Sequence, residues 1–77
     1  MERRPAQPMP PDVQDALVES GVLPDYQKRP FYQRNDYLAW IGRARRAETR
    51  ERRINQMIDE LRRGGVYMRM DHPPSSR

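Results

Sequence analysis

The sequence contains no cysteine and a single histidine, His72, among its 77 residues. Without cysteine the chain can form neither a disulfide nor a thiolate metal site. One imidazole is too few for a conventional zinc site with several histidine ligands. A chain this short buries little apolar surface, and one core of this size rarely supplies more than about 3–5 kcal/mol of net stability. Stability must therefore come from helix packing, from a partner or from self-association.

Long apolar runs are also absent, because no stretch approaches the roughly 20 residues that span a bilayer. The N-terminal segment MERRPAQPMPPD has two arginines but no apolar stretch behind them, so it does not read as a secretory signal. We therefore expect a cytoplasmic protein without membrane insertion. The sequence also lacks a Ser/His/Asp set, a phosphate-binding glycine loop and a clustered carboxylate pair. We expect neither catalysis nor a bound cofactor or metal.

Prolines are frequent near both ends of the chain. Residues 1–10 contain three of them, and the C-terminal end reads DHPPSSR. Because proline lacks an amide donor and restricts the residue before it, we expect a disordered arm over 1–10 and an extended tail over 65–77. Within that tail the segment VYMRM alternates in the manner of a short strand that could lie back over the domain. Residues 11–64 form the predicted helical domain.

Helical periodicity predicts an all-α fold, a bundle of three helices plus a short helical turn. The first helix begins near Pro11 and ends at Gly21, which can adopt a left-handed cap. Pro24 opens the short turn. The second long helix covers roughly residues 30–45 and carries two neighbouring apolar stripes. These stripes consist of Phe31, Leu38 and Ile41 and of Tyr37, Trp40 and Ala44. Because the stripes are so wide, we take this helix as the central one.

The last helix is predicted from about residue 47 to Arg63. Its apolar residues recur at helical spacing, and they are Ile54, Met57, Ile58 and Leu61. Acidic residues occupy its first turn, arginines occupy its last turn and Gly64 follows, as suits the helix dipole and a C-terminal cap.

The segment from Tyr37 to Gly64 reads YLAWIGRARRAETRERRINQMIDELRRG. Its spacing YxxWI…ETRxxRI fixes two aromatics, a turn and two arginines in one register. This stretch resembles the C-terminal helical segment of the bacteriocin-protection, YdeI/OmpD-associated family, and residues 11–17 and Arg34 match more loosely. The family usually has proline where this chain has Ala47. The resemblance implies a helical fold and a bacterial protective or stress-response role, but no defined chemistry.

Arg34 and Arg50 fall on the apolar faces of the two long helices. An arginine placed there needs a partner, because an unpaired buried charge is costly. One interpretation is a structural ion pair or carbonyl contact, for which the nearby acidic residues are Asp36, Glu48 and Glu51. The other is an anion-binding fork exposed in a groove between the helices. We favour the structural interpretation for both.

The aromatic and arginine residues around the connection between the two long helices also allow two interpretations. Tyr37 is expected in the core, whereas Trp40 suits the core and a contact surface equally. The arginines between 43 and 53 could bind nucleic acid, yet Glu48 and Glu51 interrupt them, which favours a solvated, salt-bridged face. The methionines of the tail could similarly form an adaptable contact surface or fill gaps, and His72 receives no role.

Our preferred hypothesis is a non-catalytic protein-interaction module of a bacterial protective family. Its partner surface would combine the VYMRM segment, which includes Tyr67, with five residues outside it, namely Trp40, Arg43, Arg45, Arg46 and Arg53. The alternative is a small nucleic-acid- or ribosome-associated protein, since the net charge is +4 and all but one basic residue are arginine. A homodimer is a third hypothesis, because so small a core favours association.

Overall fold

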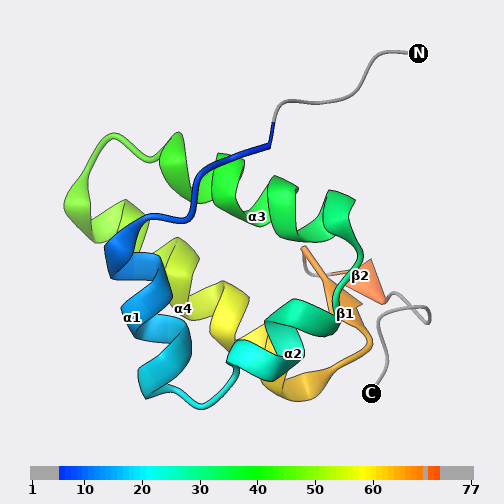
Figure 1. The fold of residues 1–77 in the computed structure, drawn as a ribbon. Helices are drawn as coiled ribbons and strands as arrows, with labels where there is room; N and C mark the ends of the chain where they lie inside the picture. Colours follow the sequence, from blue (N-terminus) through cyan, green and yellow to red (C-terminus); the bar gives the residue numbers. More distant parts are fainter. Residues whose placement is uncertain (1–5, 69, 72–77) are drawn as a thin grey trace.

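The computed structural model describes residues 6–68 and 70–71. Four helices follow one another, α1 (Pro11–Glu19), α2 (Leu23–Lys28), α3 (Phe31–Gly42) and α4 (Ala47–Arg63). Two short strands, β1 (Val66–Tyr67) and β2 (Met70–Asp71), pair antiparallel after α4 (Figure 1). The predicted all-α fold of three helices and a short helical turn is confirmed. Among the described residues no helix has the length and apolar character to cross a membrane.

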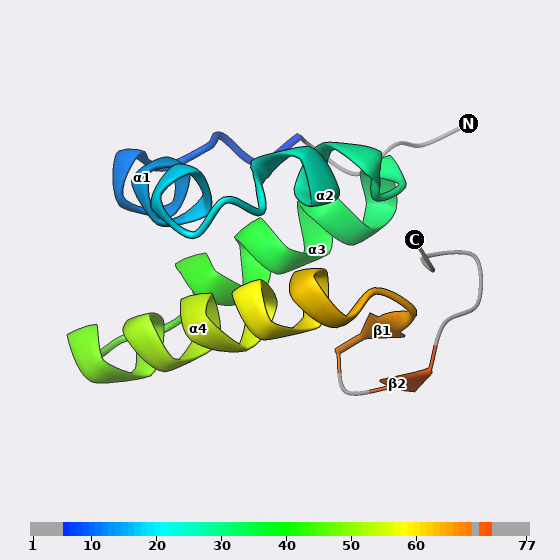
Figure 2. The ribbon, with the colours of Figure 1, turned by 90° about the horizontal axis from the view of Figure 1, so that it is seen from below.

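Helix α4 contacts α1, α2, α3 and β1. Figure 2 shows α1 and α2 on one side of the molecule, α4 on the other and the hairpin beyond the C-terminal end of α4. Our choice of the preceding helix as the central one was wrong. The narrow apolar stripe of α4 is enough for this role because α4 is 17 residues long and meets its neighbours one after another along its length.

The core draws side chains from every helix and from β1. Its buried members are Val13, Leu17, Val22, Tyr26, Tyr37, Leu38, Ile41, Ile54, Met57, Ile58, Leu61 and Tyr67. All four apolar positions predicted for the last helix are buried, and Trp40 packs at the edge of the cluster. The apolar periodicity of the chain thus identifies most of the core.

Helix α3 differs from its prediction at both ends. It stops at Gly42, three residues before the predicted end, and Ala44 lies in the turn that follows. Glycine is a poor helix former, which favours an end of the helix at this position. At the other end Phe31 is 52% exposed, so it does not share the buried stripe of Leu38 and Ile41. Its position at the first residue of the helix places it beyond the core.

The segments outside the helices also lie against the domain. Residues 6–10, expected in the arm, run along the bundle, where Met9 packs on the core and the Gln7 amide donates to Asn35 Oδ1 at 2.7 Å. In the tail, Met68 has φ of 52°, which breaks the alternation expected for a strand and turns the chain between β1 and β2. Residues 1–5 and His72 lie outside the described residues.

Helix α1 ends in a Schellman motif. The Val22 amide donates to the Leu17 carbonyl and the Gly21 amide donates to the Val18 carbonyl, each at 3.1 Å. Gly21 has φ of 72°, which confirms the predicted left-handed cap. Gly64 after α4 also has positive φ, at 66°.

Two glycine substitutions should have opposite effects on stability. An added Cβ meets nothing within 4 Å at either Gly21 or Gly42. Gly21→Ala should nevertheless lower the free energy of unfolding by about 1–2 kcal/mol, because its φ is left-handed. Gly42→Ala should raise it by up to about 1 kcal/mol, because alanine is the better helix former. Thermal or urea unfolding measures both, and equal effects would contradict the backbone assignment.

Candidate functional site

The turn between α3 and α4 carries a concentration of positive charge that we call the arginine corner, formed by Trp40, Arg43, Arg45, Arg46 and Arg53. Arg43, Arg45 and Arg46 are exposed within four consecutive positions. Arg46 lies 3.8 Å from Glu48, but both side chains are largely exposed, at 80% and 74%, so this pair contributes little. Among the described residues, the side chains of Arg43 and Arg45 have no hydrogen-bond or ion-pair partner.

Arg53 fixes the aromatic part of the arginine corner. Its guanidinium carbon lies 5.2 Å from the centroid of the Trp40 ring, within cation–π range. Its Nη1 donates to the Trp40 carbonyl at 2.7 Å, near the C-terminal end of α3, where a cation is favoured. Arg53 therefore joins α4 to α3 and holds Trp40 in place. The exposed charges of the corner are those of the turn, Arg43, Arg45 and Arg46.

Tyr67 does not lie at the arginine corner. It is 7% exposed, its hydroxyl donates to Asp36 Oδ2 at 2.6 Å, and its ring meets the edges of Tyr32 and Tyr37 at centroid distances of 6.0 and 5.5 Å. The whole of α4, about 25 Å at 1.5 Å per residue, separates the turn from the hairpin (Figure 2). The structure therefore splits the surface that we predicted and places Tyr67 in the core.

Arg50 has a partner that none of our candidates anticipated. Its Nε and Nη2 donate to the two carboxylate oxygens of Asp12 at 2.8 and 3.0 Å, and Nη1 reaches the Ile41 carbonyl at 3.4 Å. The structural interpretation holds for Arg50, but the acid comes from α1. Helical periodicity could not find a partner that lies 38 positions away in the sequence.

The hydrogen bonds from Arg50 hold the pKa of the Asp12 carboxyl below its ordinary value, although partial burial acts in the opposite direction. The Asp12 side chain is 53% exposed, so solvent screens the pair. Arg34, in contrast, keeps its Nε buried without an acceptor. The predicted ion pair with Asp36 is not among the contacts described for Arg34.

A buried polar network, unpredicted from the sequence, joins α2, α3, α4 and the hairpin. Arg29, only 4% exposed, donates to Gln33 Oε1 at 3.1 Å, to the Val66 carbonyl at 2.8 Å and to the Glu60 carbonyl at 3.1 Å. The Glu60 carboxylate, 2% exposed, accepts from the Tyr37 hydroxyl. We call this the Arg29–Glu60 network.

Two further groups donate hydrogen bonds to the Glu60 carboxylate. The Met68 amide donates to Oε1 at 2.8 Å, and Gln56 Nε2 donates to Oε2 at 3.0 Å. Burial, together with the bond to Glu60, raises the pKa of Tyr37 far above its ordinary value, so its hydroxyl remains a donor. The sequence offered one signal, because Glu60 sits three positions after Met57 at the edge of the apolar face.

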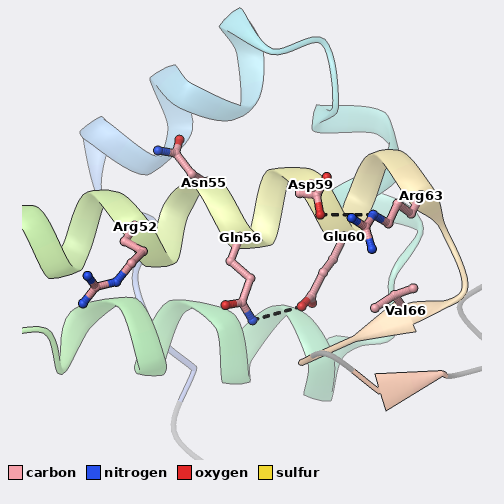
Figure 3. A pocket seen from close by; sticks show the side chains of 7 residues that line it. All are labelled: Arg52, Asn55, Gln56, Asp59, Glu60, Arg63 and Val66. Atoms are coloured by element: carbon pink, nitrogen blue, oxygen red, sulfur yellow. Dashed lines mark hydrogen bonds and ion pairs between the residues drawn. The ribbon is translucent and has the colours of Figure 1, made fainter.

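A pocket of about 550 Å³ lies along α4 beside β1 (Figure 3). Its lining is polar and of mixed charge, with Arg52, Asn55, Gln56, Asp59, Glu60, Arg63 and Val66. Arg63 forms an ion pair with Asp59 at 3.1 Å, and Gln56 donates a hydrogen bond to Glu60, so these lining groups already bond to one another. Over residues 6–68, no three carboxylate or imidazole side chains gather in a way that could hold a metal ion.

Comparison with known proteins supplies one match. The sequence model of the family described as bacteriocin-protection, YdeI or OmpD-associated matches residues 7–64, three quarters of the chain. The chain belongs to this family. This result confirms the resemblance carried by the YxxWI…ETRxxRI spacing. No curated protein and no solved structure matches the chain.

The family match includes the arginines of both surfaces discussed above in this YdeI/OmpD-associated chain. It covers the arginine corner and most of the Arg29–Glu60 network, but ends before β1. The network thus joins the matched helices to a hairpin that lies outside the match. Membership establishes the fold type, while a function has to be argued from the side chains themselves.

Removing the Tyr37 hydroxyl tests the Arg29–Glu60 network. Tyr37→Phe should lower the free energy of unfolding by about 1.5–3 kcal/mol, because a buried hydrogen bond to a charged group is lost. The matched control is Tyr26→Phe, whose hydroxyl has no described partner and whose loss should cost no more than about 0.5 kcal/mol. Chemical denaturation measures both, and equal losses would show that the network adds nothing specific.

The Asp12–Arg50 pair should make stability depend weakly on pH. The pKa of Asp12 is lower in the folded than in the unfolded state, so its contribution is present above about pH 4 and disappears as pH falls through the folded value. Asp12→Asn should therefore cost up to about 1 kcal/mol at pH 7 and nothing near pH 2. Asp15→Asn, an equal change in charge on the same helix, is the control. A cost that persists at low pH would refute this origin.

Proposed function

We propose that the protein is a non-catalytic interaction module that binds an acidic surface of a partner protein through the arginine corner. The observation that supports it is the contrast between two sets of arginines. Arg29, Arg50 and Arg53 are bonded within the fold, whereas those of the turn are exposed and nearly without partners. Guanidinium groups are suited to bidentate contact with carboxylates.

Trp40 strengthens the case for a protein partner. Its ring is partly buried and is held by Arg53, so it offers an aromatic contact at little further cost in side-chain entropy. Tryptophan and arginine are among the residue types enriched at the energetic centres of protein interfaces. In this proposal the protein works in the cytoplasm, within a protective or stress response of its host.

The nucleic-acid alternative is less favoured by the placement of charge. A protein that follows a phosphate backbone presents a continuous basic stripe. Here three exposed arginines cluster in one turn, and the other exposed arginines among the described residues, Arg52, Arg62 and Arg63, are spread along α4, where acidic residues such as Glu48 and Glu51 interrupt the positive charge. Such a compact patch suits contact with a local acidic surface of a protein better than contact with an extended nucleic-acid strand.

Neutralising the turn should weaken partner binding without affecting the fold. The test variant replaces Arg43, Arg45 and Arg46 by alanine and leaves Arg53 intact, because Arg53 supports Trp40. The matched control replaces Lys28, Arg62 and Arg63, an equal change in charge at the other end of the molecule. Loss of three surface charge contacts should weaken binding between about threefold and a hundredfold.

Affinity capture from the host, followed by titration with the partner so identified, provides the measurement. Both variants should keep the wild-type melting temperature within a few degrees, since exposed substitutions change stability little. Equal capture by the two variants would contradict the assignment of the corner. Retention that disappears after nuclease treatment would support the nucleic-acid alternative instead, and a concentration-dependent sedimentation coefficient would indicate a homodimer.

A further inference from the structure

A second pocket lies away from the arginine corner, between α2, the first half of α3 and the extended residues before α1. Its volume is about 230 Å³, and its lining includes Met9, Tyr26, Phe31, Arg34 and Leu38. Arg34 precedes Arg43 by nine positions, or roughly 14 Å along the helix axis. A ligand of this size would not reach both sites, so this inference does not rest on the proposed function.

Arg34 is the single charged residue among those that line this pocket. Its Nε is shielded from solvent and has no acceptor, and no hydrogen bond or ion pair joins the side chain to another described residue. A guanidinium that is partly removed from water and lacks a counterion is destabilised. Among the guanidinium nitrogens of Arg34, Nε alone is buried without an acceptor, so the two Nη groups remain able to donate to an anion.

Tyr26 adds a neutral donor to the same pocket. Only 6% of its surface is exposed, and its hydroxyl has no described hydrogen-bond partner. Burial raises the pKa of Tyr26, while the positive charge of Arg34 opposes that change. The hydroxyl is therefore protonated at neutral pH and can donate to the anion that Arg34 attracts.

The rest of the lining is uncharged, with the polar residues Gln7 and Asn35 beside three apolar side chains, and it limits the ligand to one charge. Met9 and Leu38 pack in or against the core, while Phe31 is 52% exposed and would gain from being covered. One arginine balances one negative charge, and the volume lies just below the usual range for drug-sized ligands. We propose that this pocket binds a small monocarboxylate with an apolar body, its carboxylate on Arg34 and Tyr26 and its body against Phe31.

Benzoate and its uncharged counterpart benzamide test the site in the intact protein. Titration of the ¹⁵N-labelled chain with benzoate at constant ionic strength should produce saturable amide shifts around residues 26, 31, 34 and 38. Benzamide should bind at least about tenfold more weakly, because it lacks the charge that strengthens a hydrogen bond to arginine. Absence of saturable benzoate binding, or shifts centred on residues 43–46, would overturn the proposal.

Substitutions then assign the binding to named groups. Arg34→Gln should weaken benzoate binding about tenfold or more, and Tyr26→Phe should weaken it severalfold without changing the fold. Arg45→Gln removes the same charge at the arginine corner and should bind benzoate as the wild type does. If the amide spectrum of the Arg34→Gln variant loses its dispersion, that variant is unfolded, and the affinity of the Tyr26→Phe variant for benzoate then tests the site. Wild-type affinity in that variant, or in a folded Arg34→Gln protein, would refute the site.

Discussion

The buried carboxylate of Glu60 is the constraint on which the arrangement of this domain depends. A charge at 2% exposure is unfavourable unless donors surround it, and those donors come from three separate elements. Tyr37 supplies one from α3, Met68 one from the hairpin and Gln56 one from α4 itself. Because each bond is directional, α3 and the hairpin can adopt few positions relative to α4. Apolar packing alone would permit many more.

Arg29, the residue that directly follows α2, plays the complementary part. It reaches the carbonyls of Glu60 and Val66, which lie where α4 ends and the hairpin begins. A small domain without disulfides has little apolar surface with which to fix a terminal segment. Here the buried guanidinium supplies that function by satisfying backbone acceptors. The short helix α2 is thereby held against the C-terminal end of α4.

The sequence predicted the parts of the fold that follow from local periodicity. Ile54, Met57, Ile58 and Leu61 are all buried, and Gly21 has the expected left-handed conformation. Prediction failed where a residue's environment is determined by a distant segment. The acid that binds Arg50 lies in α1, and the donors to Glu60 come from α3 and the hairpin, so no helical wheel could pair them. Phe31 was misplaced because a wheel shows direction but not where the neighbouring helix ends.

The inability of local spacing to find distant partners also explains why some predictions for the arginines were right and others were wrong. In the sequence they form one basic run. Helical spacing set Arg50 apart on the apolar face, but nothing in the spacing separated Arg53 from Arg43, Arg45 and Arg46. The fold divides them, because α4 turns two of them toward α1 and α3 and leaves the others in the turn. Tyr67 was grouped with them through its neighbours in the tail, yet the hairpin carries it into the core at the far end of α4.

The position of Trp40 has a practical consequence. It is the only tryptophan of the chain, and it lies at the edge of the core beneath the Arg53 guanidinium, beside the exposed turn. Its indole emission therefore originates almost entirely from one corner of the molecule. The unlabelled protein therefore contains an intrinsic fluorescent reporter of binding at that corner.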